Sequence, residues 1–263
     1  MLSPLFSSVS LVIPARNEAG SIPWVLRRIP EMVDEVILVD SSTDDTVAVA
    51  RSVRPDIVVV HQKQRGKGAA LRSGFEAATS AYVVMIDADG SMDPFEIPRY
   101  VWLLQEGFHV VKGSRHLEGG GSTDFTWVRS LGNSALRGVA NRLYAARFTD
   151  LCYGYLGFQR SAIDAIMPSV DGFDVEAQLI LRAKRLGLRI TEVPTMERPR
   201  IAGVSKLNAI PDGARVLRTI VRERMRQDWL AGARPAFAYR ESQRGDSEPL
   251  GTFETATRRR APA

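Results

Sequence analysis

The sequence has little cysteine and no long apolar run, and each absence excludes a class of site or structure. Cys152 is the single cysteine among 263 residues, so an intrachain disulfide is impossible and Cys₂His₂ or Cys₄ zinc sites are excluded. A single thiol is typical of a reducing compartment, so we expect a cytoplasmic protein. No window approaches 18 uninterrupted apolar residues, which predicts no transmembrane helix. If the protein works at a membrane, we expect it to lie peripherally on the inner face.

Two common nucleotide-binding motifs are also missing. The spacing Gly-x₄-Gly-Lys-Ser/Thr of a P-loop does not occur. The first apolar run is not followed by Gly-x-Gly-x-x-Gly, which argues against a dinucleotide-dependent dehydrogenase. What the chain does have is a net charge of +5, from 35 basic and 30 acidic residues. This modest excess fits phosphate-rich ligands or an anionic membrane surface.

Short apolar runs rich in β-branched residues alternate with helical patterns, which predicts an α/β fold with a mostly parallel central sheet flanked by helices. Strands are expected at residues 9–13, 36–39, 57–60, 82–86, 110–111 and 188–193. Helices are expected near residues 21–30, 44–53, 67–79, 94–106, 126–147, 174–186 and 208–229. Beyond residue 232 the chain turns polar and irregular, so we expect residues 233–263 to form a disordered, mobile tail.

The last predicted helix, residues 208–229, is amphipathic. One side of it carries Leu217, Ile220, Val221, Met225 and Trp229, and an adjoining stripe carries Arg215, Arg218, Arg222 and Arg226. Two interpretations are open: the helix lies on an anionic membrane, or it packs its apolar face on the domain. Packing on the domain is the preferred interpretation.

Asp87-Ala88-Asp89 directly follows the strand predicted at residues 82–86. On an extended chain, carboxylates two residues apart point the same way, and like charges so close repel one another. A divalent cation such as Mg²⁺ relieves this repulsion, since it takes one or two carboxylates together with substrate phosphates. The motif therefore predicts an enzyme that handles a phosphorylated or nucleotide substrate.

Polar residues also follow the first two strands, at the edge where parallel sheets bind ligands. Pro14-Ala15-Arg16-Asn17-Glu18 closes the first strand, and its side chains suit a base edge and a ribose. The alternative is an ordinary loop before a helix. Asp40 ends the second strand and suits a base N–H or a ribose hydroxyl. For Asp40 taken alone, helix capping is the preferred interpretation.

Two basic segments have the composition expected of phosphate-binding loops. Gly66-Lys67-Gly68 precedes a helix, and a helix N-terminus and a lysine both favour anions. Residues 200–206 place two cations and a hydroxyl around Gly203, as a loop that closes over phosphates would; a solvated basic loop is the alternative. Glu176, at the start of a predicted helix, is a candidate acid or base, or else a helix-start charge.

The order and spacing of these motifs resemble a family 2 glycosyltransferase of the GT-A fold, closest in outline to polyprenyl- or dolichyl-phosphate sugar synthases. The resemblance covers about residues 8–228, and Arg200-x-x-Gly203-x-Ser205-Lys206-Leu207 is specific to this branch. It implies a GT-A domain over residues 1–232, with a nucleotide-binding half at 8–115 and an acceptor half at 116–232. The other matching positions are residues 39–46, Gly113-Ser114-Arg115, Asp150, Gly154-Tyr155, Arg160, residues 173–176 and Glu192-Val193-Pro194.

The resemblance also implies residue roles. The nucleotide sugar would be bound by Pro14, Ala15, Arg16, Asn17, Glu18, Asp40, Lys67, Asp87 and Ala88. Asp89, with Asp87 beside it, would hold the Mg²⁺ or Mn²⁺ that bridges the diphosphate. The donor diphosphate and an acceptor phosphate would be neutralised by Arg115, Arg129, Arg200, Ser205 and Lys206. The residues expected to carry the chemistry are Asp89, Arg200, Lys206 and Glu176.

The implied reaction is inverting, metal-dependent transfer of a sugar from a UDP- or GDP-sugar to an acceptor phosphate, with polyprenyl phosphate as the preferred acceptor. A phosphate is already anionic, whereas a hydroxyl acceptor would need a base, for which Glu176 and Asp150 are the candidates. Ser91 departs from the pattern, because dolichyl-type synthases often carry a metal-binding Gln there, so coordination here would be looser or water-filled.

Three alternatives were weighed. The first is the same chemistry on a small soluble hydroxylated or phosphorylated metabolite. The second is a non-catalytic nucleotide-sugar binding module, which the retained carboxylate pair and basic loop disfavour. The third is a sugar-1-phosphate nucleotidyltransferase, which should carry a glycine-rich loop where Pro14 to Glu18 stands. No nucleic acid partner is expected.

Overall fold

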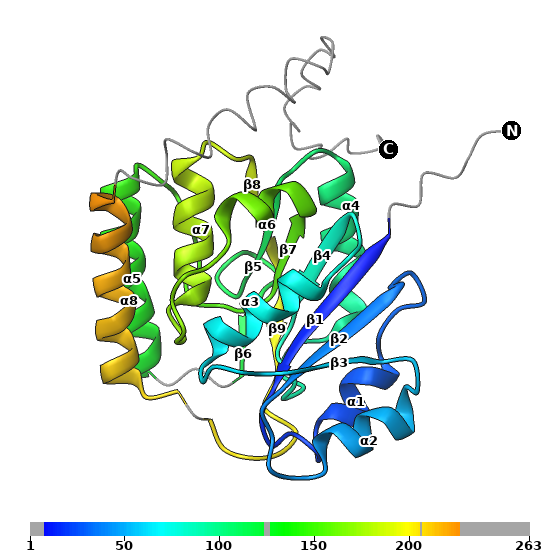
Figure 1. Ribbon diagram of the computed structural model, residues 1–263. Helices are drawn as coiled ribbons and strands as arrows, with labels where there is room; N and C mark the ends of the chain where they lie inside the picture. The colour runs from blue at the N-terminus through cyan, green and yellow to red at the C-terminus, as the bar shows by residue number, and fades with distance from the viewer. Residues whose placement is uncertain (1–7, 124–126, 206, 227–263) are drawn as a thin grey trace, which may run out of the picture. The chain divides into compact units, whose positions relative to one another are not determined.

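A seven-stranded sheet with the order β3-β2-β1-β4-β7-β5-β8 carries the fold in the computed structural model of the protein (Figure 1). The structure describes residues 8–123, 127–205 and 207–226. The strands of this sheet are β1 Val9–Ala15, β2 Glu35–Asp40, β3 Val58–His61, β4 Tyr82–Met85, β5 Val110–Ser114, β7 Leu156–Gln159 and β8 Ile190–Pro194. A small second sheet pairs β6 Gly121–Ser122 with β9 Met196–Glu197.

Parallel pairing dominates the central sheet, as the alternating pattern predicts. β1 pairs in parallel with both β2 and β4, and Ala15 lies opposite Asp40 in the register. β2 pairs in parallel with β3, and β5 with β8. The carboxyl ends of β1, β2 and β4 therefore meet at one edge of the sheet, which is where the sequence places its polar motifs.

β7 is an addition that the sequence analysis did not predict. It runs antiparallel between β4 and β5, in the middle of the sheet. Leu156-Gly157-Phe158-Gln159 is too short, and with its glycine too weak in strand propensity, to stand out from a loop. Its pairing on both sides and the complete burial of Leu156 and Phe158 make it a strand. The helix that follows it, α6 Arg160–Ile166, was also not predicted, because its 7 residues are too few to show a helical period clearly.

Helices cover both faces of the sheet. The remaining helices are α1 Ile22–Arg27, α2 Thr46–Val53, α3 Lys67–Ala77, the 3₁₀ turn η1 Pro94–Glu96 that leads into α4 Ile97–Gln105, α5 Trp127–Tyr144, α7 Val175–Arg185 and α8 Ala209–Met225. Leu11 and Ile13 pack in one cluster with residues of α1 and α4, while Val12 points to the other face, against Gly74 of α3. This alternation along β1 is that of a strand buried on both sides.

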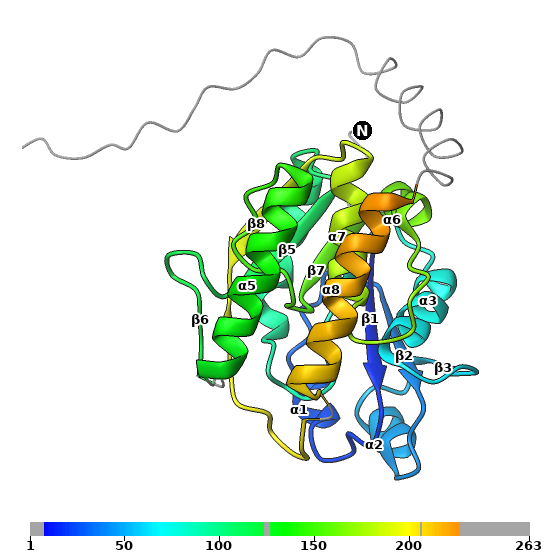
Figure 2. The same cartoon turned by 90° about the vertical axis from the view of Figure 1, so that its left-hand side faces the viewer.

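The predicted α/β fold with a mostly parallel sheet is therefore confirmed. Helix α8 is also present and packs against α5 and α7 (Figures 1 and 2), but its predicted apolar side is only partly buried: Ile220 packs on the domain, whereas Leu217, Val221 and Met225 are exposed. Residues 227–229 of the predicted last helix, and the tail expected at 233–263, lie outside the described residues. Within the part of the chain that is described, no helix combines the length and the apolar character needed to cross a bilayer.

Candidate active site

The loop after β1 is fastened to the loop after β2. The backbone N–H of Asn17 donates to Oγ of Ser42 (2.8 Å), and the backbone N–H of Thr43 donates to Oδ1 of Asn17 (2.8 Å). Asn17 has a φ of 57°, in the left-handed region that asparagine tolerates better than most residues. The Pro14 to Glu18 motif and the residues after Asp40 thus form one surface at the carboxyl edge of the sheet.

Asp40 is buried, and its two carboxylate oxygens differ. Oδ2 accepts a hydrogen bond from the backbone N–H of Ser42 (3.2 Å) in a local turn, but Asp40 caps no helix, because α2 begins at Thr46 with Asp45 at its N-cap. Oδ1 is buried and accepts no hydrogen bond from the described residues. A buried acceptor without a partner costs about 1–3 kcal/mol, so it is suited to a donor brought by a ligand. Asp40 can therefore stabilise the turn through Oδ2 and bind a ligand through Oδ1 at the same time.

Arg200 joins three segments that are distant in sequence. Its Nη1 lies 2.9 Å from Oδ2 of Asp89, and its Nη2 donates to Oε1 of Glu18 at 2.9 Å. The backbone N–H of Ile201 donates to the carbonyl of Asp89 (3.0 Å), which fixes the segment over the loop after β4. The Nε of Arg200 is buried and has no hydrogen-bond acceptor among the described residues. The site thus holds one unpaired donor and, at Asp40, one unpaired acceptor.

Asp89 has the chemistry of a metal ligand that shares its ion with a substrate. Its Oδ1 accepts from the backbone N–H (2.9 Å) and the Oγ (2.7 Å) of Ser91, so Ser91 orients the carboxylate. The described residues contain no group of three His, Cys, Asp or Glu side chains that could hold an ion by themselves. One or two carboxylates beside cations fit Mg²⁺ or Mn²⁺, which take the remaining ligands from substrate phosphates and water.

Lys67, the first residue of α3, lies between two carboxylates. Its Nζ is 2.5 Å from Oδ1 of Asp87 and 2.7 Å from Oε1 of Glu176, which lies in the first turn of α7. Burial alone would lower the pKa of Lys67, but the two carboxylates outweigh it and raise the pKa above its usual value. Lys67 therefore stays charged and ties the first turn of α7 to the Asp87 motif.

The glycines on either side of Lys67 serve close packing. Gly66 has a φ of 116°, and a Cβ built on it would overlap the carbonyl oxygen of Asp171. A Cβ on Gly68 would overlap the carbonyl oxygen of Val170. The backbone N–H of Gly68 donates to the carbonyl of Asp171 (2.8 Å), so the start of α3 is held against residues 170–171. This contact sets the position from which Lys67 reaches Asp87.

Arg115 and Asp150 form a second charged group. Nε and Nη2 of Arg115 contact the two oxygens of Asp150 at 2.7 and 3.0 Å, and Nη1 contacts Glu197 at 3.1 Å. Burial would raise the pKa of Asp150, but Lys112 and Arg115 hold it well below the usual range. Such a carboxylate binds protons too weakly to suit a general base. Lys112, a buried lysine inside β5 that the sequence analysis did not select, donates to the carbonyl of Tyr153 (3.0 Å).

The other predicted residues are placed less centrally. Arg16 is exposed, and Ser205 is exposed with its Oγ accepting from the backbone N–H of Leu207 (3.3 Å). Pro14 and Ala15 are the last two residues of β1, and Ala88 lies in the loop after β4. The predictions for Lys206 and for the side chain of Arg129 lie outside the described residues.

Similarity to solved structures supports the fold. A crystal structure of glucosyl-3-phosphoglycerate synthase from Mycobacterium tuberculosis, in complex with Mn²⁺, uridine diphosphate and glucosyl-3-phosphoglycerate, superposes with a TM-score of 0.67. It is 27% identical, and the match covers 84% of this chain and 81% of the other. The expected GT-A fold is confirmed by this similarity.

Sequence comparisons give the family. The model of glycosyl transferase family 2 matches residues 10–167. Polyprenol monophosphomannose synthase from Mycolicibacterium smegmatis is 31% identical over 212 residues, covering 75% of this chain and 80% of that protein. Dolichyl-phosphate hexose transferase from Haloferax volcanii is 29% identical over 220 residues, covering 82% and 94%. The chain therefore belongs to glycosyl transferase family 2 and is a glycosyltransferase.

Proposed function

We propose that this enzyme transfers a hexosyl group from a UDP- or GDP-sugar to an acceptor phosphate, most favourably polyprenyl phosphate, with inversion at the anomeric carbon and with Mg²⁺ or Mn²⁺. The observation that carries the proposal is the double contact of Arg200 with Asp89 and Glu18. This double contact brings together the loop after β1, the Asp87 to Asp89 motif and the basic segment that contains Arg200. A nucleotide diphosphate would contact all three when it binds.

Different residues of the site would contact different parts of the donor. The unpaired Oδ1 of Asp40 would accept a hydrogen bond from the base or the ribose, beside the loop of Pro14 to Glu18. Asp89, with Asp87 next to it, would hold the metal ion, which neutralises charge on the leaving diphosphate when it is bound. The guanidinium group of Arg200 would turn from the two carboxylates toward the phosphates. Its Nε, which has no acceptor among the described residues, would supply a further donor. Ser205 and Lys206 would extend this cationic segment.

The proposed acceptor needs no strong base. A phosphate monoester is already anionic near neutral pH, and Glu176 is paired with Lys67 at 2.7 Å. We therefore propose that Glu176 positions Lys67 and Asp87, and that Asp150 positions Arg115 on the acceptor side. The two synthases of lipid-linked sugars among the relatives support a lipid phosphate.

A soluble phosphorylated acceptor is the second candidate. It is favoured by the solved structures of glucosyl-3-phosphoglycerate synthase, whose match covers 84% of this chain. The two candidates differ in the attacking group: a phosphate oxygen attacks in polyprenyl phosphate, whereas a hydroxyl of phosphoglycerate would attack and would need a base.

The test is a transfer assay with purified protein. Radiolabelled UDP- and GDP-hexoses would be incubated with Mn²⁺ and either polyprenyl phosphate in detergent or 3-phosphoglycerate in buffer. Label extracted into organic solvent with the lipid acceptor supports the proposal, and the anomeric proton coupling of the product reports inversion. Label found only in the aqueous product with 3-phosphoglycerate would establish the second candidate instead.

A further inference from the structure

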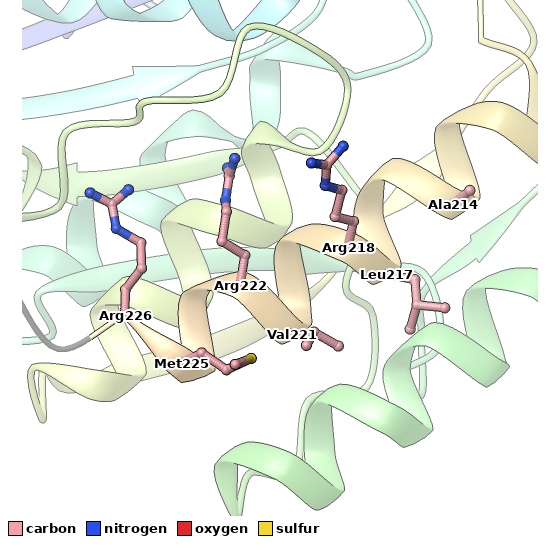
Figure 3. Close-up of a pocket in the computed structure, with 7 residues that line it drawn as sticks. All are labelled: Ala214, Leu217, Arg218, Val221, Arg222, Met225 and Arg226. Atoms are coloured by element: carbon pink, nitrogen blue, oxygen red, sulfur yellow. The ribbon is translucent and has the colours of Figure 1, made fainter.

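Helix α8 has apolar residues on its outward side. Val216, Thr219, Ile220 and Glu223 are buried against the domain, whereas Leu217, Val221 and Met225 are exposed. Met225 is 74% exposed, which is unusual for a side chain of its size and character. Figure 3 shows these three side chains on one side of the helix and the arginines at positions 218, 222 and 226 on the adjoining side.

Polar bonds fix α8 in this orientation. Glu223 is fully buried, with Oε1 accepting from Nε2 of Gln178 (2.5 Å) and lying 3.1 Å from Nη2 of Arg182. Oγ1 of Thr219 donates to Oδ2 of Asp174 (2.6 Å), at the start of α7. Rolling the helix to cover its apolar strip would leave these buried groups unpaired, which is costly. The apolar strip is therefore held outward.

The neighbouring helix α5 continues the apolar surface. Among the side chains of α5 that the structure describes, the exposed large apolar ones are Leu131, Val139 and Leu143, which recur at the spacing of one helix face. α5 and α8 pack against each other and run side by side, and both begin at the end of the domain where β1 and β2 finish (Figure 2). Ile210, which is 82% exposed, extends the apolar surface to the first turn of α8.

The charge on this surface has one sign. Arg142, Arg218 and Arg222 are exposed and form no ion pair with the described residues. α5 contains no acidic residue, and the two acidic residues of α8, Asp212 and Glu223, are buried. We call the following exposed residues the α5–α8 face: Leu131, Val139, Arg142, Leu143, Ile210, Leu217, Arg218, Val221, Arg222 and Met225.

We propose that the α5–α8 face docks on an anionic lipid bilayer. An apolar strip bordered by arginines is what binds a helix at the boundary between headgroups and acyl chains. The arginine stems can lie along the apolar strip while the guanidinium groups reach lipid phosphates. A second copy of the chain fits this face less well, since its own arginines would face those of the first.

Docking here would set the active site beside the membrane. The segment that leads from Arg200 to α8 carries the exposed Val204 and Leu207, so apolar side chains continue from the face to the catalytic edge. An enzyme held this way would meet a lipid phosphate at the surface of the bilayer. The inference concerns where the enzyme binds, and it holds whether the acceptor of the proposed reaction is a lipid or a soluble phosphate.

The experiment is vesicle flotation of the full chain without donor or metal. Vesicles of phosphatidylcholine alone are compared with vesicles that also contain phosphatidylglycerol. We expect binding to the anionic vesicles, weakened by salt, and little binding to the neutral ones. Arg218→Ser with Arg222→Ser should weaken binding on the order of thirtyfold, as expected for two cations near an anionic surface. The matched control is Arg27→Ser with Arg51→Ser, exposed arginines on α1 and α2, which should leave binding unchanged.

The apolar strip is tested separately. Val221→Asp with Met225→Asp should abolish flotation, while Val58→Asp, at a residue with the same 42% exposure as Val221 but on β3, should not. An unchanged thermal melt shows that each variant is folded. Equal binding of wild type to neutral and anionic vesicles would overturn the proposal. So would a dimer, measured by light scattering, that Val221→Asp with Met225→Asp converts to a monomer, because the face would then be a subunit interface.

Discussion

Nη1 of Arg200 lies 2.9 Å from Oδ2 of Asp89, so the guanidinium group already contacts the carboxylate that we propose as the metal ligand. The same guanidinium contacts Glu18, which keeps it at the site. A divalent ion arriving alone would meet repulsion from Arg200, whereas an ion arriving with a diphosphate brings compensating negative charge. The geometry therefore favours joint binding of metal and nucleotide sugar.

We expect Asp89→Asn to reduce sugar transfer by about 10³-fold, the scale of losing one preorganised electrostatic contact to the leaving group. The substitution keeps the shape of the side chain, and the melting temperature should change little. Release of nucleoside diphosphate, measured with and without EDTA, checks this. Full activity in EDTA would contradict the metal requirement.

Arg200→Ala should have opposite effects on the metal and on the reaction. Without nucleotide, Mn²⁺ should bind more tightly, because the competing cation is gone, while transfer should fall by about 10²-fold or more. Arg198→Ala is the matched control, since Arg198 lies in the same segment but contacts Asp93. Calorimetry with Mn²⁺ and the transfer assay give the two readouts; parallel changes in both variants would argue against the assignment.

Lys67→Met should destabilise the protein by about 3–5 kcal/mol, because it leaves buried carboxylates without their cation. Glu176 is 5% exposed and Lys67 10%, so solvent screens this pair only weakly. Adding Glu176→Gln to Lys67→Met should recover part of the loss, since one buried charge is removed. Denaturant unfolding of both single variants and the double variant measures the coupling.

Gly68→Ala should destabilise the protein by about 1–3 kcal/mol, as overpacking of a tight contact does. Its Cβ would overlap the carbonyl oxygen of Val170. Gly138→Ala is the matched control, because Gly138 lies inside α5 with open space around it, and alanine there should stabilise by about 0.5–1 kcal/mol. Thermal unfolding of the two variants should shift in opposite directions.

Asp150→Asn should lower stability at neutral pH and lower it less in acid. The folded-state pKa of Asp150 lies below its unfolded value, so the stabilisation is complete at neutral pH and declines as the pH falls below about 4. The difference in unfolding free energy between wild type and variant should therefore shrink from pH 7 to pH 3. A difference that stays constant with pH would show that packing, and not charge, accounts for the loss.

The parts of the fold that depend on local pattern could be predicted from the amino-acid sequence. β1, β2 and β4 are continuous apolar runs that end in polar residues, so their burial and the shared edge of Asp40 and Asp87 follow from periodicity. Carboxylates two residues apart at Asp87 and Asp89 indicate a divalent cation from chemistry alone. The family could also be predicted, because its motifs follow one another in a fixed order.

Which of these groups contact one another depends on long-range packing and could not be predicted from the sequence. β7 is a strand because β4 and β5 pair with it, and nothing in its four residues specifies that position. The contacts of Lys67 with Glu176, and of Arg200 with Glu18, join residues more than 100 positions apart. The outward apolar strip of α8 was also invisible in the pattern, which shows amphipathicity but not direction. Buried polar partners on α7 set that direction, since leaving Glu223 unpaired would cost more than exposing Met225.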